Sequence, residues 1–465
     1  MNLTNKILVI FAGMVLASSC SKQLALLPSD SVVESLAFPT VASLERGIIG
    51  VYAQFNGAYD DEIYASALYS DEATLPTENN TGRGVATYRW QVDPGDGDVT
   101  SAWFSYYFAI DRANRVLAAA DKIKGINATE ESQRLRIKGE ALALRAFGHL
   151  QLMINYSENY ELTSLGVAYM EKSEISKPSR ITVGADITKI NADLTLAATL
   201  IPSTFTSTSS SRITQNVLYA IRARTALYAK NWDDAIAAST SAINAVPLAS
   251  RANYPLIWTD KSVAEVIWKN VRDVSQERIG DTYYDRSLAK IMYGPSSELA
   301  SSFTTTDIRL ASTVLSRGAG RNSLGKYIGG DANEPNRADV KVFRTAEMYL
   351  IRAEAYAEKA NLTGAAADLN GLRAARISPY VPQVYTDKPS FITEVIQERF
   401  KELAFEGQRM SDLKRRLLPV TRLAVDAINA LGAVTLNPAD KVYYYPIPDS
   451  EIKANENMVQ NPRYR

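Results

Sequence analysis

The chain has 465 residues, of which 46% are hydrophobic and 22% charged, and its 51 basic residues equal its 51 acidic residues in number. This composition is typical of a folded protein with one large domain or two or three small ones. A formal net charge of zero favours neither nucleic acid nor an anionic membrane as a partner. The only cysteine, Cys20, excludes an internal disulfide, a cysteine-rich zinc site and a CxxC redox pair.

Residues 1–20 have the layout of a secretory signal peptide. One lysine precedes an apolar run over residues 7–16, which is too short for a membrane-spanning helix, and small residues follow. Ala17–Cys20 resembles a bacterial lipobox, which predicts that residues 1–19 are removed and that Cys20 is lipidated. Two or three acyl chains anchor a protein stably, because each buried methylene contributes about 0.8 kcal/mol. The alternative is a plain signal peptide with an incidental cysteine.

Apolar residues recur at helical spacing in three early segments, Thr40–Asn56, Ala102–Ile123 and Glu131–Tyr156. Between the first two, residues 57–101 break the pattern and contain many turn-forming residues. His149, the only histidine, lies on an apolar background in the third segment. Because no GxSxG or cysteine nucleophile motif accompanies it, a core or groove histidine is favoured over a catalytic one.

Two later segments, residues 216–247 and 344–376, match the pattern of a tetratricopeptide repeat, in which small and bulky apolar residues occupy fixed positions on paired helices. One such hairpin cannot bury its own apolar face, so each predicts neighbouring helices. We therefore expect a mainly α fold with tetratricopeptide-type helical repeats over about residues 40–247 and 343–415.

The segment ERFKELAFEGQRMSDLKR, residues 398–415, predicts one helix with a charged side and an apolar side. Glu402 and Glu406 are one turn apart, and Arg409 and Asp412 share that face, so an ion-paired network is favoured. A glycosidase needs two carboxyls that face each other across a cleft, about 5 or 6.5–9.5 Å apart, which neighbours on one helix seldom supply. We expect no catalytic residue, no enzyme activity and no cofactor.

Ligand contacts are expected on the irregular segments, because loops on a rigid scaffold commonly carry recognition. Residues 249–340 predict a loop-rich insertion with short strands, including a buried strand or an edge strand at Glu265–Trp268. Aromatic faces stack on the apolar side of a pyranose ring, and planar donors select among hydroxyls. This chemistry singles out Tyr88, Trp90, Tyr283, Tyr284 and Tyr293, with Arg286 for polar contacts. For Tyr88 and Trp90 the alternative is burial as a lid over the core.

A loop over residues 329–339 contains Asp331, Asn333 and Glu334, whose oxygens are of the kind that calcium binds. Their spacing is not that of an EF-hand. We therefore expect a solvated loop and no bound metal.

Several of these segments, in order, resemble the SusD/RagB family of outer-membrane nutrient-binding lipoproteins of the Bacteroidetes. WFSYYFAIDRANRVL and KGEALALRAFGHLQLMINY resemble the family's first paired helices, and FRTAEMYLIRAEA precedes ERFKELAFEGQRMSDLKR. The ending YYYPIPDSEIKANENMVQNPRY is the most specific piece. The resemblance implies one SusD-like body over residues 20–465. Because prolines fix an extended backbone, the tail at residues 443–465 should lie along that body.

The resemblance implies a binding protein that is lipid-anchored in the outer membrane and faces the cell exterior. Such a protein captures oligo- or polysaccharides and passes them to a TonB-dependent, SusC-like β-barrel transporter. Two alternatives remain, a peptide-capturing member of the same family and a tetratricopeptide scaffold for protein partners. The family's binding face varies, so the six candidate ligand residues rest on chemistry alone.

Overall fold

The computed structural model describes residues 37–274 and 276–464. The predicted signal peptide, residues 1–19, and the predicted lipidation site, Cys20, lie outside this part of the chain. Among the described residues, no helix combines the length and the apolar character needed to cross a bilayer.

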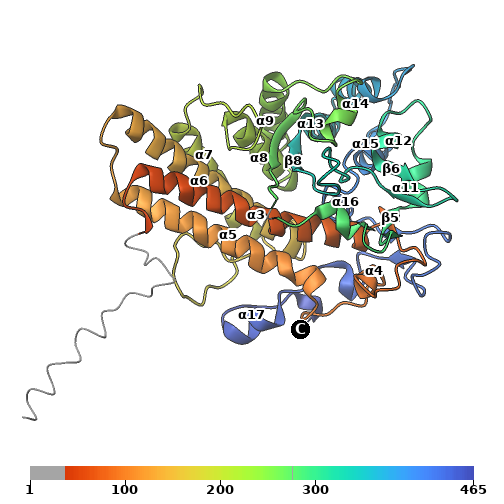
Figure 1. The fold of residues 1–465 in the computed structure, drawn as a ribbon, viewed down its shortest axis with the longest axis horizontal. Coiled ribbons are helices and arrows are strands. Elements are labelled where there is room, and N and C mark those ends of the chain that lie inside the picture. The colour runs from red at the N-terminus through yellow and green to blue at the C-terminus, as the bar shows by residue number, and fades with distance from the viewer. Residues whose placement is uncertain (1–36, 275, 465) are drawn as a thin grey trace, which may run out of the picture.

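Three long helices lie side by side in the N-terminal part of the fold (Figure 1): α3 (Val41–Tyr69), α5 (Gly97–Lys122) and α6 (Ala128–Tyr156). α3 packs on α5, and α5 packs on α6. The side chains of Asp96 and Asn127 accept hydrogen bonds from backbone N–H groups in the first turns of α5 and α6. The helices predicted over Ala102–Ile123 and Glu131–Tyr156 are thus confirmed.

α3 ends at Tyr69, so the expectation of irregular structure is wrong for residues 57–69. Its polar positions have tertiary partners that the sequence pattern does not reveal. Glu62 is buried and accepts two hydrogen bonds from Gln151 Nε2, at 2.7 and 2.8 Å, and one from the Tyr106 hydroxyl. These hydrogen bonds offset the free-energy cost of burying the Glu62 carboxylate, which would otherwise disfavour burial of this part of α3.

The remaining long helices are α7 (Val183–Leu200), α8 (Gln215–Tyr228), α9 (Trp232–Ala245), α13 (Thr345–Glu358), α14 (Leu362–Arg376) and α15 (Lys388–Glu402). They continue the array of packed helices. α7 packs on α6, α9 packs on α8, and α13 packs on α9, α14 and α15. The mainly α-helical fold is therefore confirmed.

The two predicted repeat hairpins share one turn geometry. Lys230 between α8 and α9, and Ala360 between α13 and α14, have left-handed backbones with φ of 54° and 59°. The next residue in each, Asn231 or Asn361, accepts a hydrogen bond from the third residue beyond it and caps the second helix. Their assignment to the tetratricopeptide type stays a prediction.

Short strands form two-stranded antiparallel ribbons between the helices. β2 (Val266–Asn270) pairs with β8 (Val340–Arg344), and both strands are buried along their whole length, which confirms the strand predicted near Glu265–Trp268. The other pairs are β1 (Ala73–Thr74) with β5 (Gly294–Pro295), β3 (Tyr284–Asp285) with β4 (Lys290–Ile291), β6 (Val314–Ser316) with β7 (Asn322–Leu324), and β9 (Val420–Thr421) with β10 (Thr435–Leu436). Short helices fill the connections: α4 (Val85–Tyr88), α10 (Tyr254–Ile257), α11 (Ser297–Ser301), α12 (Arg309–Thr313), α16 (Arg409–Arg416) and α17 (Asp449–Ala454), with 3₁₀ turns at Ile279–Thr282, Lys441–Tyr443 and Pro462–Tyr464.

The single helix predicted over residues 398–415 is wrong, because the chain turns between α15 and α16, where Phe405 and Gly407 have φ of 58° and 79°. These charged residues are ion-paired, but not along one helix face as predicted. Glu402 and Glu406 pair with Arg344 from another segment, and Arg409 pairs with Asp71. Glu402 lies between Arg344, at 2.7 Å, and Arg376, at 3.1 Å. This network is fully buried.

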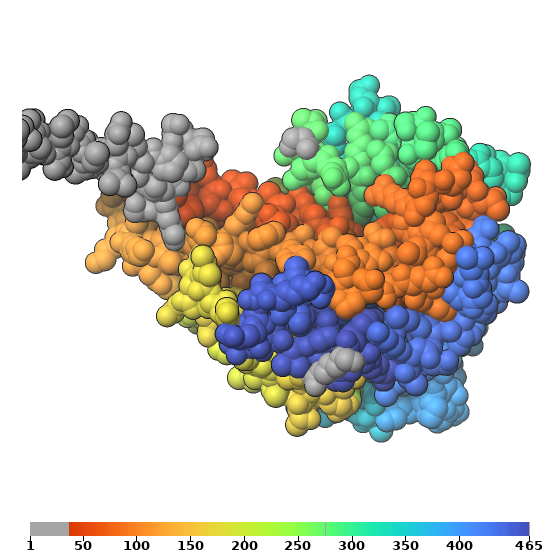
Figure 2. Space-filling model, turned by 90° about the horizontal axis from the view of Figure 1, so that it is seen from below, coloured from red at the N-terminus to blue at the C-terminus, as the bar shows by residue number. Residues whose placement is uncertain are grey.

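The C-terminal tail packs along the body, as predicted, and lies against the N-terminal helices in Figure 2 (dark blue). Tyr443 and Ile447 are fully buried. The Asn461 amide donates to the Tyr156 carbonyl at 3.1 Å and to the Tyr445 carbonyl at 2.7 Å, which ties the tail to the end of α6.

Candidate ligand-binding surfaces

The prediction that Tyr88 and Trp90 contact a ligand is corrected by the structure, because both rings are buried. Trp90 Nε1 donates to the Tyr69 carbonyl at 2.9 Å, and the Tyr88 hydroxyl donates to the Asp426 carbonyl at 2.8 Å. The Arg422 guanidinium lies over both rings, 3.9 Å from the Tyr88 centroid and 4.3 Å from that of Trp90. The alternative prediction, that Tyr88 and Trp90 are buried as a lid over the core, is therefore correct.

Tyr283 and Tyr293 are also buried, so neither ring is open to a ligand in this structure. Tyr283 packs against Phe405 with a ring-centroid distance of 5.3 Å. The Tyr293 hydroxyl donates to the Arg83 carbonyl at 2.8 Å, and its ring meets the ring of Tyr64 on α3 edge to face at 6.1 Å. Both tyrosines belong to the core that lies beneath the exposed loops.

Tyr284 and Arg286 are the predicted ligand residues that remain accessible, with Tyr284 half-buried and Arg286 exposed. Tyr284 lies in the β3–β4 hairpin, and the Arg317 guanidinium is 4.0 Å from its ring centroid. Arg286 Nε donates to Asp281 Oδ1 at 3.1 Å. The amide of the buried Asn336 donates to Asp281 Oδ1 and to the Tyr284 carbonyl, which fixes the base of the hairpin.

A second loop brings further polar groups to this hairpin. Lys290 Nζ donates to Asn80 Oδ1 at 2.8 Å, and Arg83 reaches the Thr282 hydroxyl at 3.5 Å. We call the resulting surface the Tyr284 face, which comprises Asn80, Arg83, Tyr284, Arg286, Lys290 and Arg317. It combines one accessible aromatic ring with amide, ammonium and guanidinium groups.

Sequence reasoning missed a groove of about 500 Å³ beside α3. Figure 2 shows the molecule hollowed between α3 (red) and the segment that follows β2 (green). We call it the α3 groove; its lining residues are Ile49, Tyr52, Ala53, Asn56, Ser209, Ser211, Arg212, Lys269, Asn270, Val271, Asp273, Gln276 and Asp339. No local motif marks it, because its walls come from segments far apart in the sequence.

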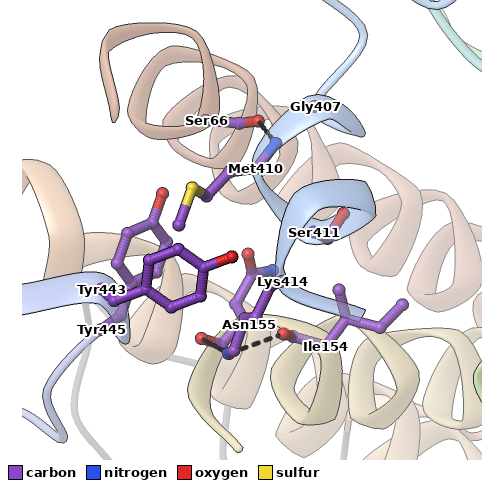
Figure 3. Close-up of a pocket in the computed structure, with 9 residues that line it drawn as sticks. All are labelled: Ser66, Ile154, Asn155, Gly407, Met410, Ser411, Lys414, Tyr443 and Tyr445. Atoms are coloured by element: carbon purple, nitrogen blue, oxygen red, sulfur yellow. Dashed lines mark hydrogen bonds between the residues drawn. The ribbon is translucent and has the colours of Figure 1, made fainter. Parts of the chain in front are cut away.

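A much smaller cavity, of about 10 Å³, lies where α3, α6, α16 and the tail meet (Figure 3). This volume holds about one water molecule, which excludes a sugar or a peptide. Lys414 projects into it and donates to the carbonyls of Ile154, Asn155 and Ser157, the last at 2.6 Å. Burial lowers the pKa of Lys414 to about 7. The lysine acts as a cap on the C-terminal end of α6.

His149 is buried, as the core interpretation predicts. Its Nε2 accepts a hydrogen bond from the Met170 N–H at 2.9 Å, so Nδ1 carries the proton and donates to the Arg145 carbonyl at 2.9 Å. The ring stacks on Tyr169 at 3.7 Å. Burial, aided by the charge of Arg145, lowers its pKa from 6.5 to about 3.

This shift predicts a loss of stability in acid. The unfolded chain binds a proton at His149 below about pH 6.5, and the folded chain does so only near pH 3. The stabilisation is present above the unfolded pKa and is lost as the pH falls toward the folded pKa. Between pH 7.5 and 4.5 the wild-type protein should therefore lose about 2–3 kcal/mol more stability than the His149→Gln variant. Urea unfolding at both values measures this, and parallel losses in the two proteins would contradict it.

The loop considered for calcium has local partners. The Asn333 N–H donates to Asp331 Oδ1 at 2.8 Å, and Glu334 pairs with Arg278 and with Arg337. Over residues 37–274 and 276–464, no group of three or more potential metal-ligating side chains is arranged to hold a metal ion.

Two family models match the chain. One, for the SusD family, matches residues 320–464, and one described as starch-binding and associating with the outer membrane matches residues 28–227. The chain is also similar to the starch-binding protein SusD of Bacteroides thetaiotaomicron, with 35% identity over 135 residues. That match covers 27% of this chain and only 22% of the relative, so it spans about a fifth of that protein's length.

Solved structures share the whole fold. A SusD superfamily protein from Bacteroides thetaiotaomicron has a TM-score of 0.80 at 22% identity, over 91% of this chain and 100% of that chain. A SusD-like carbohydrate-binding protein from Bacteroides vulgatus has a TM-score of 0.77 at 23% identity, over 90% and 98% of the two chains. The TM-scores, over at least 90% of this chain, establish a common fold.

Proposed function

Because the chain belongs to the SusD family, we propose that it captures glycans on the Tyr284 face and passes them to a TonB-dependent, SusC-like transporter in the outer membrane. The printed descriptions of its relatives support this substrate class, since one is a starch-binding protein and another a carbohydrate-binding protein. The observation that carries the proposal is the accessible Tyr284 ring, which lies among planar polar groups. The buried tyrosines Tyr283 and Tyr293 pack beneath it.

The chemistry of this face suits a neutral polyhydroxyl ligand. An aromatic ring offers an apolar surface to the axial hydrogens of a pyranose, and guanidinium and amide groups donate hydrogen bonds in fixed directions to hydroxyls. Arg317 holds the Tyr284 ring in place by a cation–π contact. Asp281 similarly orients Arg286. Part of the entropy lost on fixing these side chains is therefore lost before a ligand binds.

Retention at the cell surface rests on the lipobox-like Ala17–Cys20. We propose that a lipid on Cys20 holds the body at the outer membrane, facing the exterior, next to the transporter. Co-purification of a large β-barrel protein from membranes of the native bacterium tests the partner. Recovery of the chain in the soluble fraction would contradict the anchor.

The glycan assignment is tested by replacing Tyr284 with alanine. Loss of the stacking surface should weaken binding to a starch-type polysaccharide by at least about tenfold, with an unchanged melting temperature because the ring is not part of the core. Affinity electrophoresis and calorimetry measure this. Tyr380→Ala, at a partly exposed tyrosine in another loop, is the matched control. Undiminished binding by Tyr284→Ala would contradict the site, and binding of peptides in place of every glycan tested would contradict the substrate class.

A further inference from the structure

The loop between β9 and β10, residues 422–434, buries its charged residues and exposes its aliphatic ones. Arg422 and Asp426 are buried, whereas Ile428 and Leu431 are 70% and 71% exposed. A surface segment ordinarily buries its apolar side chains and turns its charges to water. This loop has the opposite arrangement, which leaves large aliphatic side chains on the outside of the fold. Contiguous exposed apolar surface of this kind is typical of an interaction site.

The two buried charges hold the loop against the body. Arg422 donates to backbone carbonyls that include those of Leu68 at 2.7 Å and Tyr88 at 2.6 Å. The Asp426 carboxylate accepts a hydrogen bond from the N–H of Ser297, the first residue of α11, at 2.8 Å. The loop is therefore fixed before any partner binds, so association costs little conformational entropy in this segment.

The exposed side chains lie on the side of the loop that faces away from the body. The buried residues Arg422, Asp426 and Ala430 recur at every fourth position. The Ala427 N–H donates to the Leu423 carbonyl, and the Ala430 N–H to the Ala427 carbonyl, both at 3.0 Å, so the chain winds in successive turns. Residues between the buried positions therefore point outward. The outward residues form what we call the aliphatic patch, and they are between 38% and 71% exposed: Leu423, Val425, Ile428, Leu431 and Val434.

The area of the aliphatic patch matches the apolar part of a protein–protein interface. Five aliphatic side chains at these exposures present roughly 500 Å², near the upper end of the about 300–600 Å² found for the largest apolar patch of a typical monomer. A standard interface buries about 800 Å² on each partner, and about 65% of a homodimer interface is apolar, which is again roughly 500 Å². The patch alone is therefore large enough to supply the apolar area of an interface between two chains.

The chemistry of the patch favours a second copy of this chain as its partner. In a two-fold interface each patch meets itself, so an exposed charge would face a like charge, and residues 422–434 expose none. Arg89, which donates to the Asn429 carbonyl at 3.0 Å, lies at the edge of the loop, where an interface is ordinarily polar. Lipid would strip water from loop backbone groups that no helix or strand pairs. Contacts between unrelated proteins usually centre on Trp, Tyr or Arg, and the patch contains none of them.

We propose that the protein forms a two-fold symmetric dimer through the aliphatic patch, with residues 422–434 of one copy packed against the same residues of the other. This dimer does not depend on glycan binding. The loop is also tied to the segment that carries Asn80 and Arg83 of the Tyr284 face, because Asn429 Nδ2 donates to the Leu75 carbonyl at 2.8 Å. Each dimer carries two Tyr284 faces, so a polysaccharide long enough to reach both is retained more firmly than by one chain.

Sedimentation velocity tests the dimer, on the chain without its predicted signal peptide and with Cys20→Ser so that no lipid is attached. Between about 1 and about 100 µM the mass should rise from that of one chain to that of two. Ile428→Glu and Val425→Glu each bring a carboxylate from both copies into the interface, so each should raise the dissociation constant at least about tenfold. Their melting temperatures should not change, because both side chains are exposed in the single chain. Ile126→Glu, at an exposed isoleucine between α5 and α6, is the matched control and should dimerise like the wild type.

Hydrogen exchange at the two ends of this concentration range locates the interface. Amides of residues 422–434 should exchange more slowly in the concentrated sample, whereas those of residues 123–127 should not change. A wild-type chain that stays monomeric at about 100 µM would overturn the proposal, as would a dimer that survives both glutamate substitutions or that leaves residues 422–434 unprotected. A monomeric wild type that binds phosphatidylethanolamine vesicles, or that recovers a β-barrel protein from membranes, and loses this with Ile428→Glu would assign the patch to that partner and overturn the dimer.

Discussion

Replacing Arg344 with methionine is expected to lower the free energy of unfolding by about 3–5 kcal/mol. Arg344 is fully buried and donates to three carboxylates, Glu265 at 2.6 Å, Glu402 at 2.7 Å and Glu406 at 2.8 Å. The substitution leaves these negative charges in the interior with fewer counter-charges, which costs far more than the pair itself contributes to stability. Urea unfolding should show a lower midpoint with an unchanged slope.

Lys453→Met is the matched control for Arg344→Met. Lys453 pairs with Asp449 one turn away on α17, and its side chain is 74% exposed. Exposed pairs of this kind contribute about 0–1 kcal/mol, so this variant should unfold near the wild-type midpoint. Similar losses in the two variants would contradict the role assigned to burial.

The second large effect is expected at Arg422, whose guanidinium donates hydrogen bonds to backbone carbonyls. It donates to the carbonyls of Leu68 at 2.7 Å and Tyr88 at 2.6 Å, and also to those of Ser70 and Ala433. Arg422→Met would leave these buried oxygens without a donor, at a cost of about 1–3 kcal/mol. Because they lie at the junction of α3 with the loop between β9 and β10, amide hydrogen exchange should accelerate locally, over residues 417–436 and 68–90.

An exposed arginine provides the comparison for Arg422→Met. Arg115 pairs with Asp111 on the surface of α5, with its side chain 43% exposed. Arg115→Met should leave exchange in both segments unchanged. Uniform acceleration throughout Arg422→Met would indicate global destabilisation and contradict a local anchor.

The helices could be predicted where burial follows from local periodicity. The helices α5 and α6 and the two hairpins could be predicted because apolar residues recur in them at helical spacing. The second half of α3 could not be predicted, since Glu62 is accommodated by Tyr106 and Gln151 from other helices. The break after α15 depends on left-handed backbones at Phe405 and Gly407 that the helical pattern does not reveal.

The ligand surfaces were harder to predict than the fold. Tyr88 and Tyr284 are the same residue type in similarly irregular segments, and only their tertiary contacts place one in the core and leave the other accessible. The α3 groove has no local signal either, because its walls come from segments far apart in the sequence.

The continuity of α3 sets a distance between two surfaces. Tyr52 lines the α3 groove, and Tyr64 on the same helix contacts Tyr293 and Arg83 beneath the Tyr284 face. Twelve residues of α-helix separate them by about 18 Å at a rise of 1.5 Å per residue. The helix therefore fixes the spacing of the two surfaces. A ligand shorter than this span can contact only one of them at a time, whereas a chain longer than the span is long enough to contact both.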